Sequence, residues 1–216
     1  MRLLALAAAT RRGGAALVDD ETGSVASVEF GPPLTGGAGL LPAARECLRR
    51  SGLTVADLDA LAVCRGPGSF TGLRVGLATA LGLAEGRGLP ITAPGSLEIL
   101  YRSARDEIDP VAETRVLLEA GRGLVYTRSF SGGKADGPAE LIELTELTGR
   151  PPAEVYLGGF PDDWTPPPGS RLIKGHDWVR PVDLAEVGLE YLHRGDLTPS
   201  DELKPLYLKT PAARPM

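Results

Sequence analysis

The residues best placed to do chemistry lie in one glycine-rich segment between an apolar run and an apolar helix. Residues 65–74 read Arg-Gly-Pro-Gly-Ser-Phe-Thr-Gly-Leu-Arg. A glycine-rich turn that opens a helix exposes backbone N–H groups at the positive end of the helix dipole and can hold an anion. An ordinary tight turn, with Ser69 or Thr71 capping the helix, is the alternative. The candidate anion-binding residues are Gly66, Gly68, Ser69, Thr71 and Gly72.

Neither familiar phosphate-binding signature fits this segment. The P-loop needs two glycines five positions apart, with a lysine directly after the second, and the segment contains no lysine. The dinucleotide fingerprint G-x-G-x-x-G matches Gly66 and Gly68, but its sixth position is Thr71. We therefore expect no cofactor.

Catalytic and metal-ligating residue types are sparse. His176 and His193 are far apart in the sequence, whereas zinc sites use closely spaced ligands, so we expect both side chains to be solvated. No G-x-S-x-G motif occurs. Cys47 and Cys64 fall at apolar positions and are expected to be buried. The sequence thus predicts no catalytic residue and no metal site.

Short apolar runs and turn residues predict the elements around this segment. Strands at 3–9, 15–18 and 25–30, joined by tight turns, predict an antiparallel meander. Helices and strands then alternate at 40–50, 60–64, 73–86, 89–93 and 95–106. The second half predicts strands at 115–118, 124–130, 140–144 and 155–158, and a helix at 182–192. This order indicates an α/β protein with mixed sheets flanked by helices.

The helices predicted at 40–50 and 73–86 carry the candidate partner-interface residues. The helix at 73–86 has no charged residue between positions 75 and 84, whereas a surface helix normally shows a polar face. Its small residues would let another helix approach closely, so the second face could be buried against a partner. A wholly internal helix is the alternative. The candidate partner-interface residues are Leu41, Ala44, Leu48, Leu73, Gly76, Leu77, Ala80, Leu81 and Ala84.

Composition argues against direct nucleic-acid or membrane binding. The 216 residues are 43% hydrophobic and carry a net charge of −5, with no long basic run. Affinity for nucleic acid comes largely from Lys and Arg at phosphates, so we expect any RNA to be held by a partner. The apolar start of the chain is too short to span a membrane. We expect a cytoplasmic protein.

Residues 66–76, Gly-Pro-Gly-Ser-Phe-Thr-Gly-Leu-Arg-Val-Gly, resemble the signature of the TsaB (YeaZ) family. The likeness covers the whole chain and is strong over 65–86. It implies an actin-like (ASKHA, RNase H-like) two-lobed fold with a degenerate second lobe. The first lobe, 1–108, would hold the loop and the interface helices, and 109–216 would form the second. Packing of the C-terminal segment back onto the first lobe is left open.

The resemblance also implies a function. It indicates a non-catalytic subunit of the complex that makes N6-threonylcarbamoyladenosine at adenosine 37 of tRNA, binding and activating a TsaD-type paralogue. A TsaE-type ATPase would join the larger complex, tRNA would be contacted only indirectly, and a homodimer is possible. The alternatives are an actin-like ATP-binding enzyme, a peptidase-like (glycoprotease-like) protein, or a homodimeric binding module.

The chain departs from the family at the end of its first strand. Family members usually carry aspartate where Ala7 stands, and the strand here ends in Ala7, Ala8 and Ala9. Actin-like phosphotransferases use a carboxylate at this place to organise Mg²⁺ and phosphates. Methyl groups cannot coordinate a hard cation, so we expect this phosphate site to be disabled.

Overall fold

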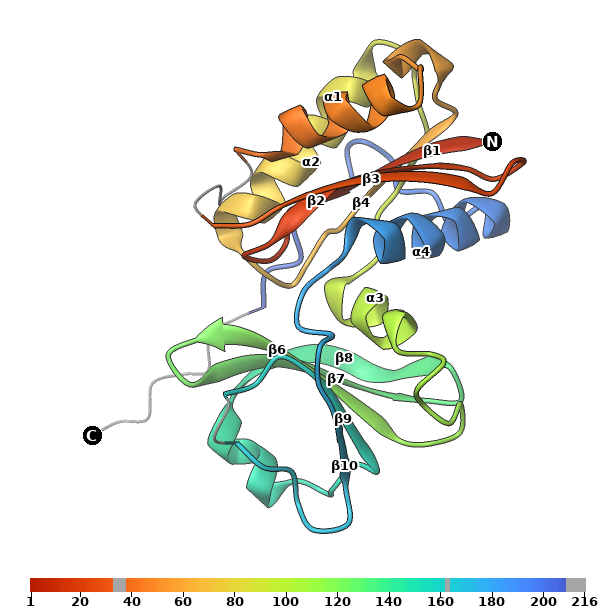
Figure 1. The fold of residues 1–216 in the computed structure, drawn as a ribbon. Coiled ribbons are helices and arrows are strands. Elements are labelled where there is room, and N and C mark those ends of the chain that lie inside the picture. The colour runs from red at the N-terminus through yellow and green to blue at the C-terminus, as the bar shows by residue number, and fades with distance from the viewer. Residues whose placement is uncertain (33–37, 162–163, 209–216) are drawn as a thin grey trace. The chain divides into compact units, whose positions relative to one another are not determined.

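The computed structural model describes residues 1–32, 38–161 and 164–208, and its chain divides into two compact units. The first unit contains Met1–Ile99 and Trp178–Leu206, and the second contains Leu100–Asp177 with Tyr207 and Leu208. Each unit is built on a five-stranded sheet (Figure 1). The lobe boundary after residue 108 stays a prediction, because compactness alone does not define a folding domain.

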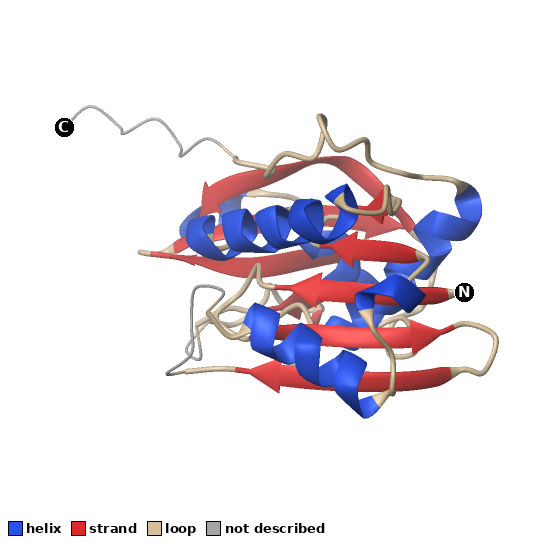
Figure 2. Ribbon diagram, turned by 90° about the horizontal axis from the view of Figure 1, so that it is seen from above, coloured by secondary structure: helices blue, strands red, loops and turns tan. Residues whose placement is uncertain are grey.

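The first sheet joins an antiparallel meander to two parallel strands. Its order is β3-β2-β1-β4-β5, with β1 antiparallel to β2 and parallel to β4. The alternating arrows beside the N-terminus in Figure 2 are this meander. The strands are β1 (Arg2–Ala7), β2 (Gly13–Asp19), β3 (Ser24–Phe30), β4 (Ala60–Val63) and β5 (Ile91–Thr92).

Helices cover both faces of this sheet, which explains why its central strands are apolar except at the ends where Arg2 and Asp19 lie. Helices α1 (Leu40–Arg50) and α2 (Phe70–Glu85) lie on one face, and α4 (Pro181–Arg194) lies on the other (Figure 1). Leu3, Leu4 and Leu6 of β1 are all fully buried. Helix α4 packs closely enough that a Cβ added at Gly188 would lie 2.5 Å from the Cβ of Ala62. The helix predicted at 182–192 thus packs on the N-terminal sheet.

The second sheet has the order β10-β9-β6-β7-β8. Its strands are β6 (Thr114–Gly121), β7 (Leu124–Ser131), β8 (Lys134–Glu143), β9 (Val155–Gly158) and β10 (Arg171–Ile173). On one face Leu117, Val125, Ile142 and Tyr156 form a small core with Leu147 of the 3₁₀ helix η2 (Leu144–Gly149). A 3₁₀ helix therefore stands where the first unit has full α-helices.

The two sheets share one topology. Numbering the strands of each unit in chain order gives 3-2-1-4-5 in both, with antiparallel pairing for 1-2 and 2-3 and parallel pairing for 1-4 and 4-5. No sequence repeat relates the halves, so the repetition is purely structural.

Some element boundaries differ from the sequence predictions. Helix α2 begins at Phe70 rather than at 73, because Ser69 caps it. Helix α3 (Ser96–Ser103) ends before the predicted 106. Strand β8 begins at Lys134, well before the predicted 140, and β10 was not predicted. The sequence of β8 resembles a turn because it contains Gly137, Pro138 and charged residues. An edge strand tolerates such residues, since the backbone on one side of it pairs with no other strand of the sheet.

Candidate interface helices and glycine-rich loop

The glycine-rich segment forms the turn between β4 and α2, and its main task is to bring α2 against the end of β1. A Cβ added at Gly68 would lie 2.2 Å from the carbonyl oxygen of Ala9, and one at Gly72 would lie 1.9 Å from that of Ala8. Real Cβ atoms do not approach so closely, so only glycine allows this contact. The backbone N–H of Ser69 donates to Ala9 O at 2.7 Å and holds the two segments together.

The hydrogen bonds of the turn bear on its use as an anion site. Ser69 is the N-cap of α2, and its Oγ accepts from the N–H of Gly72 at 3.2 Å. The N–H groups of Ser69 and Gly72 are therefore engaged inside the chain. Anion binding at Gly66, Gly68, Ser69, Thr71 and Gly72 stays a prediction, and a tight, capped turn accounts for the geometry by itself.

The end of β1 carries methyl groups where actin-like phosphotransferases carry a carboxylate. Ala7 is the last residue of the strand and is fully buried, and Ala8 and Ala9 are 4% and 2% exposed. Their backbone faces the start of α2. The backbone of these residues packs closely against α2, and their methyl side chains offer no oxygen or nitrogen ligand to a hard cation.

Helix α1 divides the predicted interface residues between two environments. Ala44 and Leu48 are 4% and 8% exposed and belong to the core of the first unit. Leu41 is 57% exposed on the outer side of the helix. Arg45 and Arg49 are also exposed.

Helix α2 turns most of the predicted interface residues inward. Leu73, Gly76, Leu77, Ala80 and Ala84 are buried within the unit, and Leu81 is half-buried. Its outer face is made by other residues, namely Phe70, Thr71, Arg74, Ala78, Gly82 and Glu85. The alternative of a wholly internal helix is therefore wrong for this chain, and a role of the inward residues at an interface stays a prediction.

Sequence reasoning noted the small residues Ala78 and Gly82 but did not select them as interface positions. The available signal was helical periodicity: Leu73, Leu77 and Ala84 mark the inner stripe, and Ala78 and Gly82 lie outside it. A Cβ added at Gly82 would meet nothing within 4 Å. The middle of this outer face is small and uncharged.

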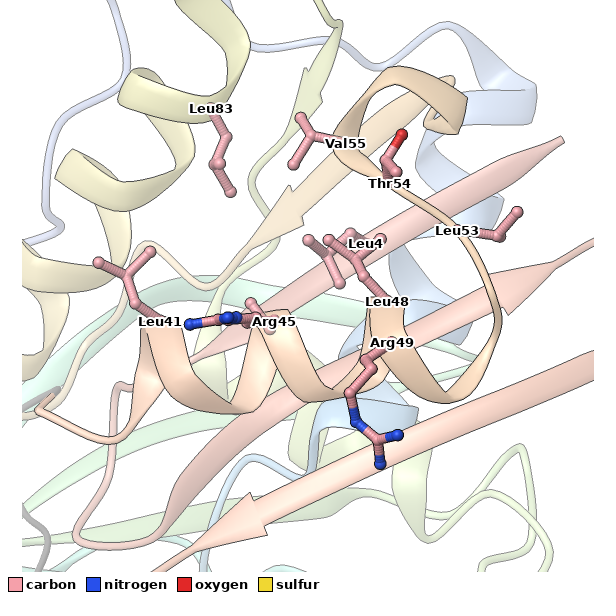
Figure 3. A pocket seen from close by; sticks show the side chains of 10 residues that line it. Leu4, Leu41, Arg45, Leu48, Arg49, Leu53, Thr54, Val55 and Leu83 are labelled. Carbon is pink, nitrogen blue, oxygen red and sulfur yellow. The ribbon is translucent and has the colours of Figure 1, made fainter.

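An apolar groove of about 410 Å³ lies between α1, the C-terminal part of α2 and the turn that follows α1 (Figure 3). Leu41, Ala44 and Leu48 line it from α1, and Leu83 lines it from α2. Leu53, Thr54 and Val55 line it from the turn, and Leu4 contributes from β1. Among the described residues that line it, Arg45 and Arg49 are the charged ones.

The charged residues of α1 differ in how they are paired. Glu46 accepts hydrogen bonds from Arg49 at 2.7 and 2.8 Å and from Arg50 at 2.9 Å. These bonds, first those from Arg49, lower the pKa of Glu46 to about 2. Arg45 forms no hydrogen bond or ion pair with any residue that the structure describes. Arg45 is thus an uncompensated cation beside an apolar groove.

The second unit contains a serine, a histidine and a glutamate in contact. Nδ1 of His176 lies 2.7 Å from Oγ of Ser103, and Nε2 lies 2.8 Å from Oε1 of Glu107. The ionised carboxylate of Glu107 can only accept, so Nε2 of His176 donates to it, and Oγ of Ser103 also lies 2.8 Å from Leu100 O. The arrangement anchors residue 176 to the end of α3.

The expectation that both histidines are solvated is wrong for His176, whose side chain is 12% exposed. His193 is 52% exposed, as expected, and lies 3.0 Å from Asp20.

Both cysteines are buried, which confirms that prediction. Over the described residues, no three His, Cys, Asp or Glu side chains come together as metal ligands. None of the described helices has the length and apolar character needed to cross a membrane.

Two mixed sheets of identical order, flanked by helices, define an α/β protein of the actin-like class. The solved structure of YeaZ from Pseudomonas aeruginosa matches with a TM-score of 0.78 at 25% identity, over 96% of this chain and 99% of that one. The chain belongs to the TsaB (YeaZ) family.

Sequence comparisons agree with this assignment. The tRNA threonylcarbamoyladenosine biosynthesis protein TsaB of Escherichia coli is 38% identical over 132 residues, which are 60% of this chain and 55% of that protein. An uncharacterized Mycobacterium tuberculosis protein is 30% identical over 82% of this chain and 76% of its own length. The family model described as TsaD, tRNA N6-adenosine threonylcarbamoyltransferase, matches residues 38–140. The chain spans about half the length of the Escherichia coli protein and of a Mycobacterium leprae relative, 55% and 45%.

Replacement of Gly72 by alanine tests the contact between α2 and β1. The new Cβ would have to displace the carbonyl of Ala8, and we expect the free energy of unfolding to fall by about 1–3 kcal/mol. Gly82→Ala in the same helix is the matched control. It meets open space, and we expect it to raise that free energy by about 1 kcal/mol. Urea denaturation measures both, and equal effects of the two substitutions would contradict the close approach.

The ion pairs of Glu46 make a pH-dependent prediction. The folded-state pKa of about 2 lies below the unperturbed value of 4.5, so the pairs stabilise α1 above pH 4.5 and are lost as the pH falls from 4.5 towards 2. An NMR titration of the Glu46 carboxyl carbon should have its midpoint near 2. In the Arg49→Gln/Arg50→Gln variant the midpoint should move towards 4.5. A wild-type midpoint at 4.5 would show that these pairs do not persist in solution.

Proposed function

We propose that this chain is a non-catalytic subunit of the machinery that makes N6-threonylcarbamoyladenosine in tRNA, and that it binds and activates a TsaD-type paralogue. The observation that carries the proposal is membership of the TsaB (YeaZ) family, whose Escherichia coli, Haemophilus influenzae and Bacillus subtilis relatives are named for threonylcarbamoyladenosine biosynthesis. The match of residues 38–140 to the TsaD family model supports kinship between the chain and its proposed partner.

The end of β1 supports the non-catalytic part of the proposal. An actin-like phosphotransferase needs a carboxylate there to hold Mg²⁺ at the phosphates, and this chain has Ala7, Ala8 and Ala9. The space is taken by the backbone contact with Gly68 and Gly72. A chain that lost this site can still contribute to a transferase complex by shaping or stabilising the subunit that reacts.

The outer sides of α1 and α2 support the partner role. Ala78 and Gly82 give α2 a small, uncharged outer surface, and small residues let two helix backbones approach closely. Beside it lie the exposed side chain of Leu41 and the apolar groove. Exposed apolar patches bordered by polar residues are typical of protein-binding sites.

The proposal also covers how the chain meets tRNA, the further subunit of the complex, and the lobe that carries the interface. The chain has a net charge of −5, so we propose that tRNA is gripped by the partner and touched by this chain only indirectly. A TsaE-type ATPase would complete the larger complex, and the complex would work in the cytoplasm. The proposed boundary between lobes, after residue 108, leaves the loop and both interface helices in one lobe.

Arginine placed on the outer face of α2 tests the interface. Because both positions are exposed, we expect Ala78→Arg to change the free energy of unfolding by no more than about 0.5 kcal/mol, and Gly82→Arg, which removes a glycine from the helix, to raise it by up to about 1 kcal/mol. Both should weaken partner binding at least tenfold. Light scattering behind size exclusion, with the TsaD-type protein of the same organism, should give a heterodimer peak for the wild type and separate peaks for the variants. Calorimetric titration gives the dissociation constants.

Ala135→Arg is the matched control, since Ala135 is exposed on β8 in the second unit. It should bind as the wild type does. Unchanged binding by Ala78→Arg and Gly82→Arg would remove α2 from the interface. A wild-type chain that does not bind the paralogue, even with tRNA, nucleotide and the ATPase added, would overturn the function.

A further inference from the structure

Strand β6 of the second unit carries an arginine on the face of the sheet that holds the apolar core. Arg115 is 8% exposed and stands between Tyr156 of β9 and Ser129 of β7, its partners in the strand register (the strands are labelled in Figure 1). Leu117, two residues further along β6, belongs to the core on the same face. A charged group in this position costs free energy unless its donors are bonded and its charge is balanced.

The guanidinium of Arg115 is only partly satisfied by the chain. Its Nε donates to Oγ of Ser129 at 3.3 Å, and its Nη2 lies 3.6 Å from Oε1 of Glu113, too far for a good hydrogen bond. The side chain of Glu113 is 44% exposed, so water screens part of its charge. Nη1 is buried and has no acceptor among the residues that the structure describes. The N–H groups on one nitrogen of a buried cation therefore lack a partner.

A second buried polar group without a partner lies on the same face. Thr127 of β7 is 3% exposed, and its Oγ1 makes no hydrogen bond to any residue in the described ranges. In the register of β6 and β7, Thr127 is opposite Leu117. Ser129, its neighbour on the same face, is opposite Arg115. Thr127 is therefore a diagonal neighbour of Arg115, at a usual spacing of about 7–8 Å that a long side chain can span.

The acid nearest to Thr127 in the sheet register is already paired. Glu140 of β8 is opposite Thr127, and both of its carboxylate oxygens accept from Arg150, at 3.0 and 2.9 Å. This bidentate pair balances the charge of Glu140 against that of Arg150. The chain thus leaves the charge of Arg115 to Glu113 alone, and that carboxylate is half in solvent.

We infer that the second unit binds a small monatomic anion, of which chloride is the common one, held by Nη1 of Arg115 and the hydroxyl of Thr127. The ion would accept from both groups and offset the charge that the arginine carries into the core. Because Nη1 and Oγ1 are both buried, an ion close in size to a water molecule fits the position better than phosphate or a carboxylate. This inference is independent of the proposed function, and either can fail alone.

An ordered water molecule is the alternative occupant of this position. Nη1 of Arg115 can only donate, and the hydroxyl of Thr127 supplies a further donor, so the groups that need a partner are mainly donors. A water molecule must place two protons of its own as well as accept, and it brings no charge. An anion accepts from every donor and balances the guanidinium, so the chemistry of the site favours the anion.

Thermal unfolding of the full chain in two sodium salts tests the site. The melting temperature should be at least about 2 °C higher in sodium chloride than in sodium gluconate at equal ionic strength, because an ion that binds only the folded state stabilises it. Gluconate is too large for an enclosed position and serves as the reference anion. Arg115→Met, which keeps much of the length of the side chain and removes its charge, should abolish this difference between the salts.

Thr127→Val is a second variant, which keeps the shape of the side chain and removes one donor. It should melt no lower than the wild type in gluconate, because an unpaired buried hydroxyl is lost, and it should lose at least half of the difference between the salts. This variant decides the question even if Arg115→Met does not fold. Arg171→Met is the matched control, since Arg171 is exposed on β10 of the same sheet, and it should keep the full difference.

Crystals of the full chain soaked in sodium bromide would locate the ion. We expect an anomalous peak within hydrogen-bonding distance of Nη1 of Arg115 and Oγ1 of Thr127. An ordered water there without anomalous signal would overturn the inference, and so would equal melting temperatures of the wild type in the two salts. A salt difference that Thr127→Val retains in full would also overturn it. A bromide peak without chloride-dependent melting would mean an adventitious ion only, which likewise contradicts the inference.

Discussion

The structure depends on the close approach of two backbones, where the start of α2 meets the end of β1. Gly68 and Gly72 lie so near the carbonyl oxygens of Ala9 and Ala8 that no side chain fits between them. This contact sets the rotation of α2, so that Leu73 and Leu77 point to the sheet while Ala78 and Gly82 point outward. The side chains at this contact, Ala7, Ala8 and Ala9, carry no oxygen or nitrogen that could bind a hard cation.

The arginines of α1 differ in how they are paired. Glu46 pairs with Arg49 and Arg50 within α1, whereas Arg45 forms no hydrogen bond or ion pair with any residue that the structure describes.

The two units repeat one sheet topology with different helical cover. Both keep the strand order 3-2-1-4-5, but one face of the second sheet carries a 3₁₀ helix where the first has α1 and α2. Topology alone does not identify an activity, because many functions share this class of fold. The cluster of Ser103, His176 and Glu107 illustrates the point: three residue types that hydrolases use lie in contact, but their contact by itself assigns no activity.

The sequence by itself determined the α/β class, the strand meander, the principal helices and the family signature. These depend on local patterns: apolar runs, helical periodicity and glycines at a turn. It did not reveal strand β8, whose glycine, proline and charges are tolerated only because it lies at a sheet edge. Nor did it show which side of α2 is free, since a helix without charges has no polar stripe to mark it. Tertiary structure decided that, through the contact of Gly72 with Ala8, and it also left Arg45 without a hydrogen bond or ion pair to any residue in the described ranges. Both outcomes depend on atoms that are distant in the chain, so no local pattern could contain them.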